Sequence, residues 1–131
     1  MRKLGVWNHF EFNTIDNVAS CIYNINMNVV EIPQPLVFEW DKANKDKILA
    51  KHNITVEECE EAFQSEDIFI QSDELHSGSE DRYILIGRTK QLRPLFIVFT
   101  IRNNSVRVIS ARNMHKKEIK FYEEKTRTAK I

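Results

Sequence analysis

The sequence of 131 residues predicts an α+β fold with two helices first, then an antiparallel sheet of about four strands, then a C-terminal helix. Three observations support this prediction. Two stretches with helix-capping residues lie between residues 41 and 64, four apolar strand-like stretches lie between 67 and 112, and an amphipathic stretch begins near Met114. With 42% hydrophobic and 29% charged residues, the chain has the composition of one globular domain.

Residues 1–35 differ from the rest of the chain, because they are rich in Asn and poor in charge. Apolar residues at helical spacing between 15 and 23 predict a short helix, and two prolines close the segment. We therefore expect an N-terminal extension at 1–35 and a domain at 36–131. Met27 lies near the start of that domain, and a further hypothesis is that the natural chain begins there.

Two helices are predicted at the start of the domain, after a short apolar strand at 36–40. The first helix begins after the N-cap Asp41 and ends near Asn53, because asparagine tolerates the left-handed C-cap conformation. The second begins at Thr55, which forms a T-x-x-E capping box with Glu58.

The second half of the domain has the apolar, strand-like stretches of a β-sheet. The predicted strands are 67–71, 82–89, 95–102 and 105–112. A polar loop at 72–79 follows the first of them, and Asn103–Asn104 predicts a tight hairpin before the last. Strict alternation in the last strand places Val108 and Ser110 on one side and Ala111 on the other. The final helix is predicted at 114–126.

Charge is distributed unevenly, although the formal net charge is zero. Residues 57–81 hold ten Asp and Glu and no Lys or Arg, whereas residues 82–131 hold thirteen Lys and Arg and three Glu. This asymmetry indicates a basic surface for a polyanion and an acidic surface that engages a basic partner. The alternative is that the two segments pair with each other in the fold.

The junction of the last strand and the last helix is the most informative part of the sequence. Arg112 falls at the strand's end, and His115 and Glu118 follow at i and i+3 on one helix face. An arginine beside a histidine and a carboxylate is an arrangement that binds and acts on a phosphate. The structural alternative is an Arg112–Glu118 salt bridge.

Several motifs, in order and at matching separations, resemble the BrnT toxin family. They are FEWDKANKDKILAKH, EEAF, EDRYILIG and RVISAR, followed by Glu118 and Tyr122-Glu-Glu, and they span about residues 38–124. The chain departs from the family pattern at Asn53, where glycine is usual, and at His115, where the family varies. The positions that match are Phe38, Trp40, Asp41, Lys51, His52, Glu80, Arg82, Gly87, Ser110, Ala111, Arg112, Glu118 and Tyr122.

The resemblance implies a RelE-like fold and a ribonuclease toxin of a type II toxin–antitoxin system, which cleaves RNA without a metal or other cofactor and halts translation. It also implies a ribbon-helix-helix antitoxin as partner, with operator DNA bound only through the complex. The alternative from another class is a non-enzymatic module that binds the antitoxin and acts as a co-repressor. The two differ in whether the purified protein cleaves RNA in the presence of a chelator.

Metal-free RNA cleavage needs a base, an acid and cations that stabilise the phosphorane. We assign the catalytic group to Arg82, Arg102, Arg112, His115 and Glu118, and expect the three arginines to converge from neighbouring strands. Each arginine has a structural alternative: a salt bridge to Glu118 for Arg112, a pair with Glu80 for Arg82, and a plain surface charge for Arg102. Glu118 is assigned the role of orienting its neighbours in preference to that of base.

RNA contacts are assigned to a second group, Lys51, His52, Lys116, Lys117 and Tyr122. The first two alternatively only stabilise a helix C-terminus electrostatically. Lys116, Lys117, Lys120 and Lys125 are interpreted as a solvated basic face, and Tyr122 as half-buried with its hydroxyl at a cleft rim.

Metal, membrane and secretion signals are not found in the sequence. Cys21 and Cys59 lack metal-site or redox-motif spacing, and no run of about 18 apolar residues exists. No apolar stretch of signal-peptide length follows the basic N-terminus. We therefore expect a cytoplasmic protein that has reduced thiols and does not associate with membranes.

Overall fold

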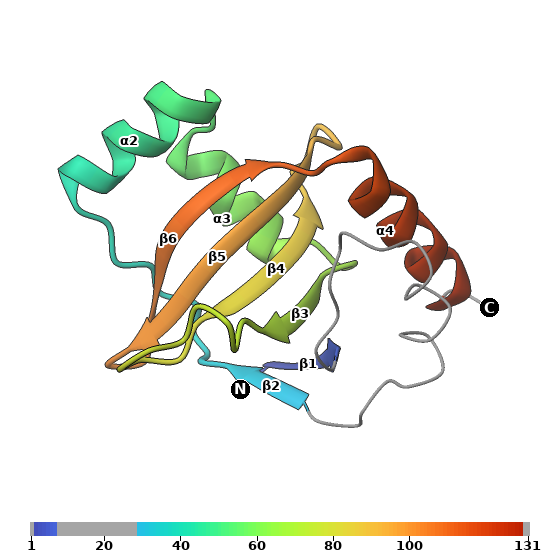
Figure 1. The fold of residues 1–131 in the computed structure, drawn as a ribbon, viewed down its shortest axis with the longest axis horizontal. Helices are drawn as coiled ribbons and strands as arrows, with labels where there is room; N and C mark the ends of the chain where they lie inside the picture. The colour runs from blue at the N-terminus through green and yellow to red at the C-terminus, as the bar shows by residue number, and fades with distance from the viewer. Residues whose placement is uncertain (1, 8–28, 130–131) are drawn as a thin grey trace.

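The structure is a computed structural model that describes residues 2–7 and 29–129, and its architecture is the predicted α+β one (Figure 1). In these residues six strands form one sheet in the order β2-β1-β3-β4-β5-β6. The helices are α2 (Lys42–His52), α3 (Val56–Gln64) and α4 (Lys116–Ala129). The strands are β1 (Arg2–Trp7), β2 (Val29–Ile32), β3 (Phe69–Ser72), β4 (Tyr83–Arg88), β5 (Pro94–Arg102) and β6 (Ser105–Asn113).

The ends of α2 and α3 are fixed by the capping residues that the sequence predicts. The Asp41 carboxylate accepts a hydrogen bond from the Asn44 N–H at 2.7 Å, and Asn53 ends α2 in the left-handed region at φ 53°. Thr55 and Glu58 form both hydrogen bonds of the capping box. Both helices therefore begin and end within a residue or two of the predicted positions.

Strands β3 to β6 form the predicted antiparallel meander, and the Asn103–Asn104 turn between β5 and β6 has both residues at positive φ. β1 adds to β3 in parallel, and β2 pairs with the other side of β1. The predicted strand at 36–40 is wrong, because Phe38 makes only one isolated bridge, to Val106. The predicted helix at 15–23 lies outside the described residues.

A β-bulge in β6 corrects the alternation predicted for that strand. Val98 faces Ser110 while the next residue, Phe99, faces Val108, so Ile109 is the extra residue on β6. Ala111 therefore joins Val108 in the buried core, and Ser110 is exposed on the opposite face. The same shift places Arg112 opposite Phe96, on the face that also carries Ser110.

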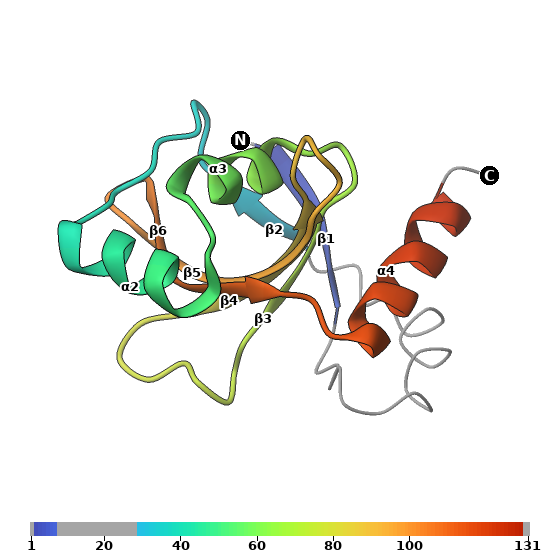
Figure 2. The same cartoon turned by 90° about the horizontal axis from the view of Figure 1, so that it is seen from above.

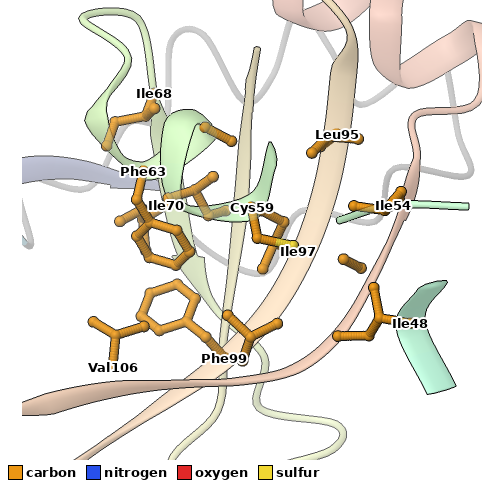
Figure 3. Close-up of a cluster of buried hydrophobic side chains, with 14 of the residues drawn as sticks. Ile48, Ile54, Cys59, Phe63, Ile68, Ile70, Leu95, Ile97, Phe99 and Val106 are labelled. Carbon is orange, nitrogen blue, oxygen red and sulfur yellow. The ribbon is translucent and has the colours of Figure 1, made fainter. Parts of the chain in front are cut away.

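Two apolar clusters hold the layers together. The larger lies between the sheet and helices α2 and α3, and includes Phe63, Leu85, Ile97 and Phe99 (Figure 3). α3 approaches β4 so closely that a Cβ on Gly87 would lie 3.0 Å from the Ala62 carbonyl oxygen. Thus any larger residue at position 87 pushes α3 away from the sheet.

The smaller cluster lies under α4, which stands apart from α2 and α3 (Figure 2). It combines Phe121 and Tyr122 of α4 with Met114 and with Ile86 of β4. Because Ile86 and Phe96 pair across β4 and β5, this cluster lies on the face to which Arg112 belongs. Within the described residues no helix is long and apolar enough to cross a membrane.

Candidate functional site

Arg112, at the end of β6, is held by two contacts. Its Nη1 and Nη2 donate to the two carboxylate oxygens of Glu118 at 2.8 and 2.9 Å, and its guanidinium carbon lies 3.8 Å from the centre of the Phe96 ring. The side chain of Glu118 is 3% exposed and that of Arg112 is 27% exposed. The carboxylate is therefore buried, while part of the guanidinium faces solvent.

One edge of the Arg112 guanidinium makes no hydrogen bond to the described residues. Nη1 also donates to the Asn113 carbonyl at 3.0 Å. The Nε–H and the second Nη2–H make no hydrogen bond to any residue that the structure describes. These two donors form the side-on fork that binds two oxygens of a carboxylate or a phosphate, and Arg102 uses its own Nε and Nη2 in this way to bind Glu80.

Glu118 is fully engaged, because its Oε1 also accepts the backbone N–H of His115 at 2.7 Å. This contact caps the N-terminus of α4, whose first turn is closed by the Ile119 N–H and the His115 carbonyl. His115 is thus the residue that precedes α4, and its side chain is exposed. The structure joins His115 to Glu118 through the backbone and not through the imidazole.

Arg82 and Arg102 do not converge with Arg112, so that expectation is wrong. Arg102 pairs with Ser105 beside the hairpin turn, and Arg112 pairs with Phe96 at the other end of β5, which places them about 20 Å apart at 3.3 Å per residue. Figure 1 shows the hairpin and the start of α4 at opposite ends of β6. Arg82 precedes β4 at the hairpin end, and Glu80 pairs with Arg102 and not with Arg82.

The basic residues Lys51 and His52 lie at the Arg112 end of the molecule. Arg93, in the β4–β5 turn, donates to the His52 carbonyl at 3.1 Å and to the Asn113 Oδ1 at 2.8 Å. The C-terminus of α2 is therefore fastened next to the end of β6. Lys51 is exposed and His52 is half-buried, while Lys116 and Lys117 are exposed on the first turn of α4.

Tyr122 is buried, which corrects its predicted place at a cleft rim. It is 1% exposed, and its hydroxyl donates to the Asp67 carbonyl. Burial raises the pKa of this phenol, and the nearby Arg88 partly offsets that effect. Lys125 is 7% exposed and so does not belong to the solvated basic face either.

Arg88 was not among the predicted site residues. It ends β4 on the α4 side, stacks over Tyr122 at 5.2 Å from the ring centre, and contacts Asp67 at 3.6 Å. The predicted strand at 82–89 included Arg88, but the sequence did not show that α4 lies over the Arg88 end of this strand.

The acidic and basic segments do pair with each other, as the structural alternative held. The pairs are Arg88–Asp67, Arg93–Glu58 and Arg102–Glu80. Glu58 of α3 is therefore held in an ion pair, with its side chain 26% exposed. In the part of the chain that is described, no three His, Cys, Asp or Glu side chains gather to hold a metal ion.

The α+β fold places an arginine, held by a buried carboxylate, at a corner with several exposed basic residues. A family model described as "Ribonuclease toxin, BrnT, of type II toxin-antitoxin system" matches residues 40–118. The match covers more than half of the chain, so the chain belongs to this family of toxins, whose substrate is RNA and whose partner is an antitoxin. No curated protein matches the chain.

Proposed function

We propose that this protein is a metal-independent endoribonuclease of the cytoplasm, whose cleavage of RNA inhibits translation. The observation that carries the proposal is the fixed Arg112, whose side-on donor fork is occupied by no described residue and which lies three positions before the exposed His115. A guanidinium held in this way is already oriented for a phosphate before RNA binds, so little entropy is lost when it does.

The reaction assigned to this corner is attack of the ribose 2′-oxygen on the adjacent phosphorus. The P–O5′ bond breaks, leaving a 2′,3′-cyclic phosphate on one product and a 5′-hydroxyl on the other. Arg112 stabilises the negative charge of the phosphorane, because its planar fork matches two non-bridging oxygens.

His115 is the group proposed to exchange a proton with the 2′-hydroxyl or the leaving 5′-oxygen. Histidine is the side chain suited to this role near neutral pH. Glu118 is not the base, since both of its oxygens already accept hydrogen bonds from Arg112 and from the His115 N–H. Its role is to orient Arg112 and to fix the start of α4.

RNA on either side of the reacting phosphate contacts Lys51, His52, Lys116 and Lys117. Contacts of this kind release counterions, so RNA binding weakens steeply as salt increases. Arg82, Arg102 and Tyr122 are left out of the proposed site, because the first two lie at the hairpin end and the third is buried.

The proposed partner is a ribbon-helix-helix antitoxin. It binds the basic face of α4, which carries Lys116, Lys117 and Lys120, through charge complementarity. Operator DNA is bound only by the complex. A complex whose affinity does not change between low and high salt would contradict this mode of binding.

The proposal is tested by incubating purified protein with RNA in the presence of a chelator and characterising the product ends. The expected products carry 2′,3′-cyclic phosphate and 5′-hydroxyl ends, and induced expression arrests growth unless the antitoxin is co-expressed. Binding of the antitoxin without any cleavage of RNA would contradict the proposal and favour the co-repressor function instead.

A further inference from the structure

Arg93 is one of the most extensively hydrogen-bonded side chains in the described part of the chain. Its Nη1 donates to the Glu58 carboxylate and the Asn53 carbonyl, both at 2.9 Å. Its Nη2 donates to the His52 carbonyl at 3.1 Å, and its Nε to the Asn113 Oδ1 at 2.8 Å. One guanidinium therefore joins the end of α2, the start of α3 and the end of β6.

The turn that carries Arg93 is itself fixed. The buried Thr89 accepts the Arg93 N–H through its hydroxyl at 3.1 Å, and its own N–H donates to the Arg93 carbonyl at 3.0 Å. Between them, Leu92 is held at φ 67°, a conformation that costs a leucine about 1 kcal/mol. Arg93 thus projects from a rigid base.

A continuous chain of polar contacts leads from Arg93 to the proposed site. The side chain of Asn113 accepts from Arg93, and its carbonyl accepts from the Arg112 Nη1 at 3.0 Å. Arg112 in turn binds Glu118, which caps α4. This series of contacts crosses the end of the sheet from α3 to α4 and passes through Asn113, the residue that follows Arg112.

We propose that Arg93 is a positioning residue for RNA cleavage, acting through Asn113 on Arg112; the inference rests on the proposed function. β6 is an edge of the sheet that the described residues form, so none of its strands holds the backbone at Asn113 on the outer side. Arg93 supplies that missing constraint, and also keeps Lys51 and His52 at a fixed distance from Arg112. A displacement of about 1 Å at a reacting group lowers rates by up to about 100-fold.

Two variants separate positioning from folding. Arg93→Lys keeps a cation for Glu58 and for the carbonyls of α2, but has no Nε–H for Asn113. Asn113→Ala removes the same contact from the other side at an exposed position, where little stability is lost. The matched control is Gln91→Ala, an exposed residue of the same turn.

The measurements are kcat and KM for RNA cleavage, with thermal melts of each variant. The expected kcat is about tenfold lower in Arg93→Lys and in Asn113→Ala, with KM within about twofold of the wild type and melting temperatures close to it. The double variant is expected to be no slower than the slower single variant, because both substitutions break the same contact between Arg93 and Asn113. Gln91→Ala cleaves like the wild type.

Unchanged kcat in both variants, in a protein that Arg112→Lys inactivates, would overturn the positioning role and leave the proposed function standing. A rise in KM alone would also overturn it, since Arg93 would then serve RNA binding only. A wild type that does not cleave RNA would remove the proposed function and this inference together.

Discussion

Two arginine–glutamate pairs lie at opposite ends of the β5–β6 hairpin and differ in burial and in the donors that they use. Arg102 binds Glu80 in a bidentate pair whose side chains are 46% and 31% exposed. Arg112 binds Glu118 in a bidentate pair whose side chains are 27% and 3% exposed. Each pair has two hydrogen bonds between the same residue types, and burial of the carboxylate is the first difference between them.

The two pairs also differ in which donors of the arginine the glutamate binds. At the hairpin end, Glu80 takes the side-on fork of Arg102, hydrogen bonding to Arg102 lowers the pKa of Glu80, and the pair is a solvated surface charge. At the α4 end, Glu118 takes the end-on pair of donors and leaves the side-on fork available. Of the two arginines, Arg112 is the one that is held by a buried carboxylate and whose side-on fork has no partner among the described residues.

The largest difference is expected between Glu118→Gln and Glu80→Gln. Glu118→Gln removes the partner of a partly buried cation, so we expect it to lower the free energy of unfolding by about 2–3 kcal/mol and to abolish RNA cleavage. Glu80→Gln is expected to leave the urea midpoint and the cleavage rate unchanged. Urea titrations and cleavage assays of both variants check this, and equal effects would mean that burial does not distinguish the pairs.

A large effect confined to activity is expected from His115→Gln. The imidazole is exposed, so stability is retained, while kcat falls about 100-fold through loss of proton transfer. His76→Gln is the control, because His76 is exposed and contacts Asp73 in the loop before β4. An unaltered rate in His115→Gln would show that another group moves the proton.

A moderate, pH-dependent effect is expected at Glu58, the acidic partner of Arg93. Burial raises the pKa of this carboxyl, but hydrogen bonds from the Thr55 N–H and from Arg93 outweigh burial and lower it below 4.5. Because the folded-state pKa is below the unfolded one, the carboxylate stabilises the fold above pH 4.5, and that stability is lost as pH falls through the folded-state pKa.

Glu58→Gln therefore reduces stability near neutral pH and makes the acid limb of the stability curve shallower. Thermal melts between pH 3 and pH 7 measure this. Glu57→Gln, at an exposed position on the same helix, is the matched control. An acid limb of Glu58→Gln with the slope of the wild type would contradict this role of the Glu58 carboxylate.

The smallest effect on activity is expected from starting the chain at Met27, which we propose as the natural start of a toxin domain at 36–131. This truncation removes β1, which pairs with β3 at the side of the sheet away from β6. Cleavage is expected within about twofold of the full chain, because every described residue of the Arg112 corner is retained. Mass spectrometry of the N-terminus of the natural protein would reject this start if it finds a peptide from residues 1–26.

Local signals predicted much of this fold. Asp41, Asn53, Thr55 and the Asn103–Asn104 turn each satisfy backbone groups of their neighbours, so a short stretch of sequence is enough to identify them. The pairing of Arg112 with Glu118 was among the alternatives for the same reason, since the two residues are six apart across one junction.

The features that were missed depend on distant segments. The bulge at Ile109 reverses the face of Arg112, and only the pairing of β6 with β5 reveals it. The three arginines do not converge, because consecutive strands of a meander run in opposite directions. The ends of β5 and β6, and with them Arg102 and Arg112, therefore lie at opposite ends of the sheet. Arg93 gave no sequence signal, because its partners lie 20 to 41 positions away.

The most direct test of the account compares Arg112→Lys with Arg102→Lys in RNA cleavage with a chelator present. Lysine keeps the charge at each position but cannot provide a planar fork. We predict that Arg102→Lys cleaves like the wild type, whereas Arg112→Lys loses at least about 100-fold in kcat while still folded. Equal losses in both variants, or full activity in Arg112→Lys, would contradict the central role given to the held arginine at the start of α4.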